Sequence, residues 1–186
     1  GGRALNNQEP KYLNSPETSL FQKGQILYQG QMTREIAHKT DQLIVVEGYM
    51  DVISLAEVGM NNAVAPLGTA LTEGQIRELW KFSTEPIICF DGDSAGMRAA
   101  LRASDRLLPI LEPGFSARFA SLPPGEDPDD IVRRGGANKF RGLLEASTGL
   151  SDFFWETEKS NGSLDTPEKQ AAFFKRIRKR VREIKN

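Results

Sequence analysis

Hydrophobic residues along the chain gather in short runs, and a helical pattern of apolar and polar positions follows each run. The runs are LIVV (43–46), NAVA (62–65), PIICF (86–90) and ARFASL (117–122), and the helical patterns that follow are DVISLAEVG (51–59), TEGQIRELWKF (72–82), SAGMRAALRASDRLLPIL (94–111) and PDDIVRRGG (128–136). Alternating strands and helices are typical of a parallel sheet with helices on its faces, joined by right-handed crossovers. We therefore predict an α/β domain over residues 42–136.

The two flanking segments have different patterns. Residues 1–41 are polar and weakly patterned, with a turn-rich stretch at 11–18 and one or two short helices over 21–40. Residues 137–186 read as helices without strands, and Thr166 followed by Pro167 is a typical start for the last of them. In this last helix, Phe173, Ile177 and Val181 form an apolar stripe that we expect to be packed. The expected organisation is an N-terminal segment, an α/β domain and a helical C-terminal subdomain.

Composition limits the classes of protein that the chain can belong to. With 186 residues, 39% of them hydrophobic, it can bury one real core. One cysteine and one histidine exclude a disulfide framework and a four-ligand zinc site. Cys89 lies inside an apolar run, so we expect a buried thiol. No run approaches the roughly 18 apolar residues of a membrane span and no signal peptide is evident, so a cytoplasmic protein is expected.

Charge is distributed unevenly although the formal net charge is only −1. Acidic residues gather in FDGD (90–93) and GEDPDD (125–130), whereas the last 13 residues hold seven Lys or Arg and one Glu. The basic helix could guide single-stranded DNA, or it could pack through its apolar stripe with a solvated basic face. We favour the packed helix.

The acidic residues follow the predicted strands. Glu47 ends the first apolar run, Asp91 and Asp93 follow the third, and the GEDPDD group follows the fourth. Ligands of open parallel sheets bind at the carboxyl ends of the strands, so these carboxylates can meet at one edge. Because clustered carboxylates repel one another, they suit a divalent cation such as Mg²⁺, which prefers oxygen ligands and often shares them with phosphates. The pattern indicates phosphoryl transfer.

Each acidic group also has a structural interpretation. Asp93 directly precedes a helix and can be its N-cap, and the acidic residues of DPDD can form an ordinary acidic first helical turn. In PLGTALT (66–72), Gly68 and Thr69 could approach phosphates, or the segment could be a plain loop capped by Thr72. The pattern alone leaves these alternatives open.

Four motifs together resemble the Toprim module of bacterial replicative DNA primase. They are VVEGYMDVISL, PLGTALT, FDGDSAG and PGEDPDD, and upstream GGRAL, PKYLNSPET and FQKG are similar to the segment that precedes this module in the family. The resemblance runs from residue 1 to about 136. It implies an α/β, Toprim-like parallel sheet over 42–136, after the end of the N-terminal polymerase subdomain (1–41) and before a truncated helical subdomain (137–186).

The resemblance also implies roles for individual residues. The core metal-binding and catalytic carboxylates would be Glu47, Asp91 and Asp93, supported at the metal or triphosphate by Asp51, Asp127 and Asp129. The cofactor would be Mg²⁺, with Mn²⁺ as a substitute and no zinc. Basic positions that line the groove of primases correspond to Arg3, Lys11 and Lys23, which on their pattern alone are ordinary solvated charges. They would contact template, primer or triphosphate, together with Gly68 and Thr69.

The activity implied is the synthesis of short RNA primers on a single-stranded DNA template from ribonucleoside triphosphates at bacterial replication forks. The replicative helicase would be engaged through a domain absent from this chain, and the isolated chain is expected to have weak activity or none. Two other readings keep the fold: strand cleavage, as in type IA topoisomerases and some nucleases, and a non-catalytic module, as in recombination mediators. The chain's tyrosines lie in contexts unlike that of a topoisomerase nucleophile, and the complete carboxylate set argues against the non-catalytic reading.

Overall fold

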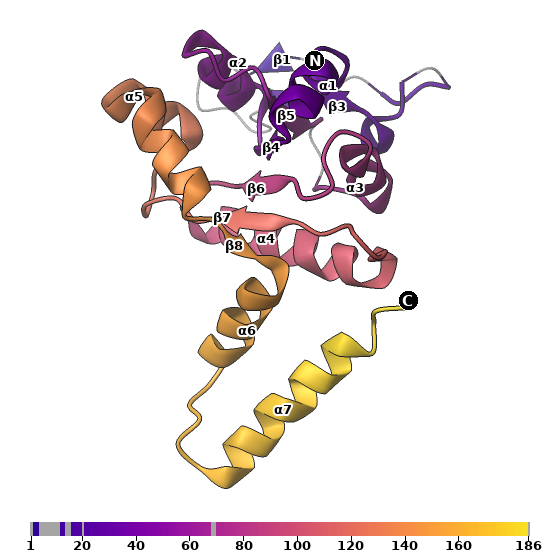
Figure 1. Cartoon of the computed structure of the whole chain (residues 1–186), viewed down its shortest axis with the longest axis vertical. Coiled ribbons are helices and arrows are strands. Elements are labelled where there is room, and N and C mark those ends of the chain that lie inside the picture. Colours follow the sequence, from indigo (N-terminus) through magenta and orange to yellow (C-terminus); the bar gives the residue numbers. More distant parts are fainter. Residues whose placement is uncertain (1, 4–11, 14–15, 20, 68–69, 186) are drawn as a thin grey trace.

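The fold was analysed in a computed structural model that describes residues 2–3, 12–13, 16–19, 21–67 and 70–185. In its central part strands and helices alternate (Figure 1). The elements are β4 (Ile44–Val45), α2 (Tyr49–Glu57), β5 (Ala63–Pro66), α3 (Glu73–Trp80), β6 (Ile87–Cys89), α4 (Ser94–Leu107), the short 3₁₀ helix η2 (Leu108–Ile110), β7 (Arg118–Ala120) and α5 (Pro128–Glu145). The four strands and the helices that follow them confirm the pattern predicted from hydrophobicity. Among the described residues, no helix has the length and apolar character that crossing a membrane requires.

The main sheet is mixed, with parallel strands at its centre and an antiparallel strand at each edge. Its order is β3-β5-β4-β6-β7-β8, and β5, β4, β6 and β7 are mutually parallel. The edge strands β3 (Leu27–Tyr28) and β8 (Thr148–Gly149) pair antiparallel with β5 and β7. Sequence reading missed both edges, because two residues are too few to show a period.

The helices cover the sheet on both faces, and strand side chains alternate between the two layers. In β4 and the residue after it, Ile44 and Val46 pack in one core cluster with α2 and α5, whereas Val45 packs in the other with α3 and α4. In β6, Ile88 joins the second cluster while Cys89 joins the first and is fully buried, as predicted. Two apolar layers thus hold the central strands and fix where each strand ends.

The flanking segments begin with short elements. A separate two-stranded sheet pairs β1 (Gly2–Arg3) with β2 (Tyr12–Leu13), and it is followed by a 3₁₀ helix η1 (Lys23–Gln25), β3 and α1 (Gly30–Thr40). Thr72 caps α3 by accepting a hydrogen bond from Gln75 N at 3.1 Å and donates one to Gly24 O at 2.5 Å. The cap predicted for Thr72 is therefore confirmed, and it also joins η1 to α3.

Two helices, α6 (Leu150–Ser160) and α7 (Pro167–Val181), extend from the sheet as a V-shaped pair (Figure 1). The predicted N-cap is present, since Thr166 Oγ1 accepts from Lys169 N at 3.4 Å. An ion network joins the pair, because the carboxylate of buried Glu158 lies 2.8 Å from Arg176 Nε and 3.4 Å from Arg180 Nε. Arg180 also reaches Asp105 of α4 at 2.8 Å, which ties α7 to the α/β part.

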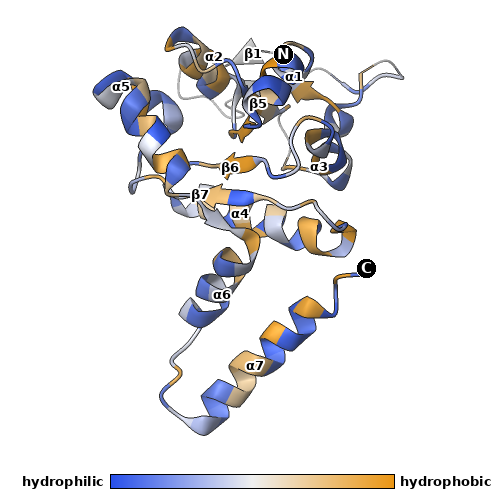
Figure 2. Ribbon diagram, in the orientation of Figure 1, coloured by the Kyte–Doolittle hydropathy of each residue, from blue (hydrophilic) through white to orange (hydrophobic). Residues whose placement is uncertain are grey.

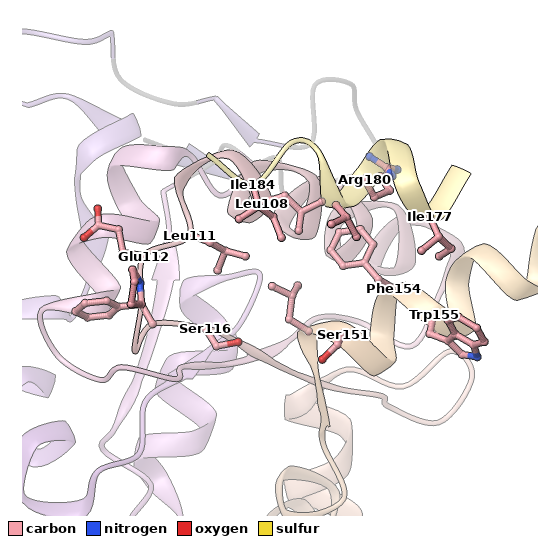
Figure 3. Close-up of a pocket in the computed structure, with 14 residues that line it drawn as sticks. Leu108, Leu111, Glu112, Ser116, Ser151, Phe154, Trp155, Ile177, Arg180 and Ile184 are labelled. Atoms are coloured by element: carbon pink, nitrogen blue, oxygen red, sulfur yellow. The ribbon is translucent and has the colours of Figure 1, made fainter. Parts of the chain in front are cut away.

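The apolar stripe of α7 is buried only in part, which corrects the prediction that it packs through Phe173, Ile177 and Val181. Phe173 is 2% exposed and lies against Trp155 of α6, but Val181 is 59% exposed. A pocket of about 560 Å³ separates this stretch of α7 from η2 (Figure 3). Figure 2 shows that apolar and polar residues both occur along α7. Because Phe174 and Val181 are exposed, part of the apolar surface of α7 faces solvent.

Candidate active site

The acidic residues lie at the point where chain connections diverge from neighbouring strands. Glu47 follows β4 and Asp91 follows β6, and these two strands pair directly. The connection from β4 runs through α2 to β5 on one side, while that from β6 runs through α4 to β7 on the other. Ligands of open α/β sheets bind at such a switch point, beyond the carboxyl ends of the strands.

Glu47 and Asp91 are in direct contact across this switch point. Glu47 Oε1 accepts a hydrogen bond from the backbone N of Asp91 at 3.2 Å. Two glycines allow the chain around Asp91 to pack closely: a Cβ on Gly92 would stand 2.0 Å from Pro123 O, and one on Gly96 would stand 2.1 Å from Asp91 O. Any larger side chain at either position would displace the backbone that carries the Asp91 carboxylate.

Asp93 and Asp127 both serve as helix caps. Asp93 Oδ1 accepts from the backbone N of Ala95 at 2.8 Å and of Gly96 at 2.7 Å, at the start of α4. Asp127 Oδ1 accepts from Asp130 N at 2.7 Å, at the start of α5. The cap predicted for Asp93 is thus confirmed, whereas Asp127 is the N-cap before the acidic first turn that Asp129 and Asp130 form. It leaves the second carboxylate oxygen of each residue available for a ligand, so capping and ligand binding are compatible.

Asp51 and Asp129 face the same region from α2 and α5. Asp51 is 8% exposed, and its Oδ2 accepts from the backbone N of Gly48 at 3.1 Å. Asp129 Oδ1 accepts from the hydroxyl of Ser54 at 2.5 Å and lies 2.8 Å from Arg133 Nε. Sequence reading did not select Ser54, because an isolated serine in a helical pattern gives no sign of a partner 75 residues away.

Burial and mutual repulsion raise the pKa values of these carboxyl groups. Burial, and then the charges of Glu47, Asp51, Asp127 and Asp93, raise the pKa of Asp91 to about 7. Burial is also the main cause that raises the pKa of Asp51 to about 6, with further contributions from Asp127, Asp129 and Glu47. The pKa of Glu47 is raised by burial and by Asp93, although the hydrogen bond from Asp91 N opposes the shift. Three strand ends therefore form one electrostatically coupled group.

These residues fit a hard divalent cation. Among the described residues, Asp91 Oδ1 is buried and receives no hydrogen bond, so an oxygen that needs a positive partner points into the protein. The described part of the chain holds no group of three acidic, histidine or cysteine side chains that would enclose a metal ion. An ion here would be held by one or two carboxylates and complete its shell with water or phosphate oxygens, which is the habit of Mg²⁺.

Stability without metal is expected to fall as pH rises. The folded state holds protons on Asp91 and Asp51 more tightly than the unfolded chain, so the resulting stabilisation is complete below about pH 4 and is lost as pH rises through about 6 to 7. In EDTA, the Tm measured by circular dichroism should be lower at pH 8 than at pH 5.5, and Mg²⁺ should raise it more at pH 8.

Two variants test the source of that pH dependence. Asp91→Asn should reduce it, because the variant removes the group with the pKa of about 7 and leaves only Asp51, with its pKa of about 6. Asp165→Asn should leave it unchanged, since Asp165 is an exposed carboxylate whose pKa is lowered by Lys169. A Tm that is the same at both pH values in EDTA would contradict the coupling of the acidic group.

Several predicted nucleotide contacts cannot be placed. Lys11, Gly68 and Thr69 lie outside the described residues, and only the backbone of Arg3, in β1, is described. Lys23 is in η1, where its carbonyl oxygen accepts from Gln75 Nε2 at 3.0 Å. This bond places η1 beside the first turn of α3, whose N-terminus follows β5 at the edge that carries the carboxylates. The roles of these five residues stay predictions.

Three family models match successive parts of the chain. Residues 1–34 match the N-terminal domain of the DNA primase catalytic core, and residues 44–132 match a Toprim-like model. Residues 151–186 match the DnaB-helicase binding domain of primase. We had expected the helicase-binding part to lie outside this chain, whereas this third match falls within it.

Known proteins are similar over nearly the whole chain. The DNA primase of Rickettsia felis is 42% identical over 178 residues, which are 96% of this chain and 30% of the relative's length. A crystal structure of a DNA primase domain from Pseudomonas aeruginosa superposes with a TM-score of 0.92 at 42% identity, over 99% of this chain and 58% of that one. A structure of the DnaG primase catalytic domain bound to ssDNA superposes with a TM-score of 0.88 at 41% identity, over 99% of this chain and 59% of that one. The chain belongs to the bacterial DNA primase family and corresponds to part of its catalytic core.

Proposed function

We propose that this chain carries the metal-binding half of a primase active site, which synthesises short RNA primers on single-stranded DNA from ribonucleoside triphosphates in the bacterial cytoplasm. The observation that carries the proposal is the coupled group of carboxylates at the switch point, in a chain of the primase family. The chain spans 30% of the length of its relative from Rickettsia felis. The activity is therefore proposed for a protein of the relative's length that contains this chain, which is called the longer protein below. A solved relative bound to ssDNA supports the choice of template.

The carboxylates suggest how the reaction is assisted. Asp91 and Glu47 would hold Mg²⁺, or Mn²⁺ in its place, with Asp93, Asp51, Asp127 and Asp129 around them. The ion, when bound by these residues, would supply positive charge to the phosphate under attack and to the pyrophosphate that leaves. Glu47 Oε1 accepts a hydrogen bond from Asp91 N, so Oε2 would be the oxygen of Glu47 that faces the ion or its bound water. Without the ion, burial and the charge of Asp93 raise the pKa of Glu47, and a bound cation would favour its charged form.

The test is primer synthesis by the longer protein, with labelled ribonucleotides, single-stranded DNA and Mg²⁺. Short labelled RNA that disappears in EDTA would support the proposal. Metal-dependent nicking of the DNA without RNA synthesis would instead favour strand cleavage, and DNA binding that needs no metal would favour a non-catalytic module. Each alternative thus has its own result.

We also propose a contact with the replicative helicase through the α6–α7 pair. The match to a helicase-binding model covers residues 151–186, which include α7 and most of α6. Three large apolar side chains of this pair are exposed, namely Trp155, Phe174 and Val181. Exposed apolar groups beside a pocket are typical of protein interfaces, so this surface suits a protein partner.

Loss of one exposed ring should weaken that contact. Phe174 is 49% exposed, so Phe174→Ala should change the free energy of unfolding by only about 0.5 kcal/mol while lowering helicase affinity about tenfold. Fluorescence anisotropy of the labelled longer protein, titrated with a DnaB-type helicase, measures the affinity. Met32→Ala, an equally simple truncation at a 76% exposed site on α1, is the control. Equal affinities of both variants and wild type would exclude Phe174 from the contact.

A further inference from the structure

The carboxylates at the switch point share one arrangement. In all but Asp91, one oxygen accepts a hydrogen bond from the protein: the donors are Asp91 N for Glu47, Gly48 N for Asp51, Ala95 N and Gly96 N for Asp93, Asp130 N for Asp127, and Ser54 Oγ for Asp129. Groups that donate a hydrogen bond to a metal-ligating residue fix its orientation and commonly tune the affinity of the metal site. Four of these five carboxylates receive backbone donors, and Asp129 alone depends on a side-chain hydroxyl.

Ser54 is placed in an unusual way for a helical serine. Its usual acceptor would be a carbonyl of the preceding turn, as in Ser104, whose hydroxyl donates to Leu101 O at 2.8 Å within α4. Ser54 instead donates from α2 to Asp129 on α5 at 2.5 Å, and its side chain is buried at 5% exposure. The bond therefore crosses between two helices that cover the same face of the sheet.

The other contact of Asp129 Oδ1 is a weaker restraint. Arg133 Nε lies 2.8 Å away, one turn along α5, but the Arg133 side chain is 71% exposed. An ion pair with such an exposed partner is worth little, because the Arg133 side chain remains free to move in water. The buried hydroxyl of Ser54 is thus the group that holds Oδ1 in place.

We propose that Ser54 is a positioning residue that fixes the Asp129 carboxylate, with Oδ1 held inward and Oδ2 free to contact a divalent cation or its bound water. The inference rests on the proposed function, since it assigns Asp129 a place at the metal. Without the hydroxyl, Asp129 would pair with Arg133 and turn toward solvent. The Asp129 carboxylate would then no longer be oriented toward the cation, although α2 and α5 would still pack against each other.

Mn²⁺ binding to the longer protein tests the proposal without relying on activity, and the electron paramagnetic resonance signal of free Mn²⁺ reports it. Ser54→Ala should weaken binding about tenfold, as is usual when a group behind a ligand is lost. Ser104→Ala removes a fully buried helical hydroxyl away from the acidic group and should leave binding unchanged. The Tm of both variants in EDTA shows whether either has simply lost structure.

A double variant distinguishes positioning from a general loss of packing. If Ser54 acts through Asp129, Ser54→Ala should weaken Mn²⁺ binding less than about twofold further in an Asp129→Asn background. Unchanged Mn²⁺ affinity in Ser54→Ala, or an equal loss in Ser104→Ala, would overturn the inference. If Asp91→Asn alone abolished binding while Ser54→Ala kept it, the proposed metal site would stand and only the role of Ser54 would fall. No Mn²⁺ binding by wild type would overturn both.

Discussion

Asp91→Asn in the longer protein is expected to lower primer synthesis about a thousandfold or more while the protein stays folded. Under the proposed function Asp91 holds the metal, and loss of such a charge costs several kcal/mol of transition-state stabilisation, with each 1.36 kcal/mol a factor of ten in rate. The amide cannot replace the carboxylate, because it carries no negative charge at Asp91 Oδ1, a buried oxygen that receives no hydrogen bond among the described residues. Labelled RNA separated on a gel measures the rate.

Asp91→Asn should make the protein more stable, although it lowers activity. Burial and four neighbouring acids disfavour the charge on Asp91, so replacing it with a neutral amide should raise the Tm measured at pH 8 in EDTA. A variant that is more stable but inactive would mark Asp91 as a residue retained for chemistry. Full activity of Asp91→Asn would contradict the proposed active site, and a lowered Tm would mean that the group is structural.

Gly96→Ala should displace the backbone of Asp91, against which Gly96 packs. The added methyl group would stand 2.1 Å from the Asp91 carbonyl oxygen, so α4 and the Asp91 backbone must move apart. Overpacking of this kind costs about 1–3 kcal/mol of stability. A shift of about 1 Å at a reacting group costs about a hundredfold in rate. Thermal melts and primer synthesis measure the two effects.

The matched control is Gly142→Ala on α5. A Cβ at Gly142 would meet no atom within 4 Å, so the change should be neutral or stabilise the helix by about 0.5–1 kcal/mol. If Gly96→Ala also behaved in this way, the close contact between α4 and Asp91 would not exist. If Gly96→Ala lost stability but kept activity, the contact would matter to folding alone.

Periodicity predicted the central part of the fold well. Each apolar run ends at or near a polar residue that begins a turn, so Glu47 and Asp91 could be placed at strand ends from the sequence. Their meeting at the switch point depends on strand order, which places β4 beside β6 although β5 lies between them in the chain. Local patterns do not carry strand order, so this contact needed the structure.

The helical pattern that ends at Gly136 is confirmed, because Gly136 is non-helical, with φ 71 and ψ 177, and divides α5 into two helical parts. Other features were beyond sequence reasoning for identifiable reasons. In α7 the apolar stripe was recognised, but which part is covered depends on how far α7 stands from η2, and Val181 is left exposed. The Ser54–Asp129 bond is a long-range contact between single polar residues, which no period or motif indicates.

The buried thiol of Cys89 can report how often the main sheet opens locally. Cys89 is the single cysteine of the chain, is fully buried, and lies in β6 two residues before Asp91. Burial raises the pKa of its thiol, so alkylating reagents can reach a reactive thiolate only when the sheet opens. The alkylation rate therefore measures how often the strand that carries Asp91 separates from its neighbours. Any ligand that binds at the carboxylates should slow alkylation in proportion to its occupancy.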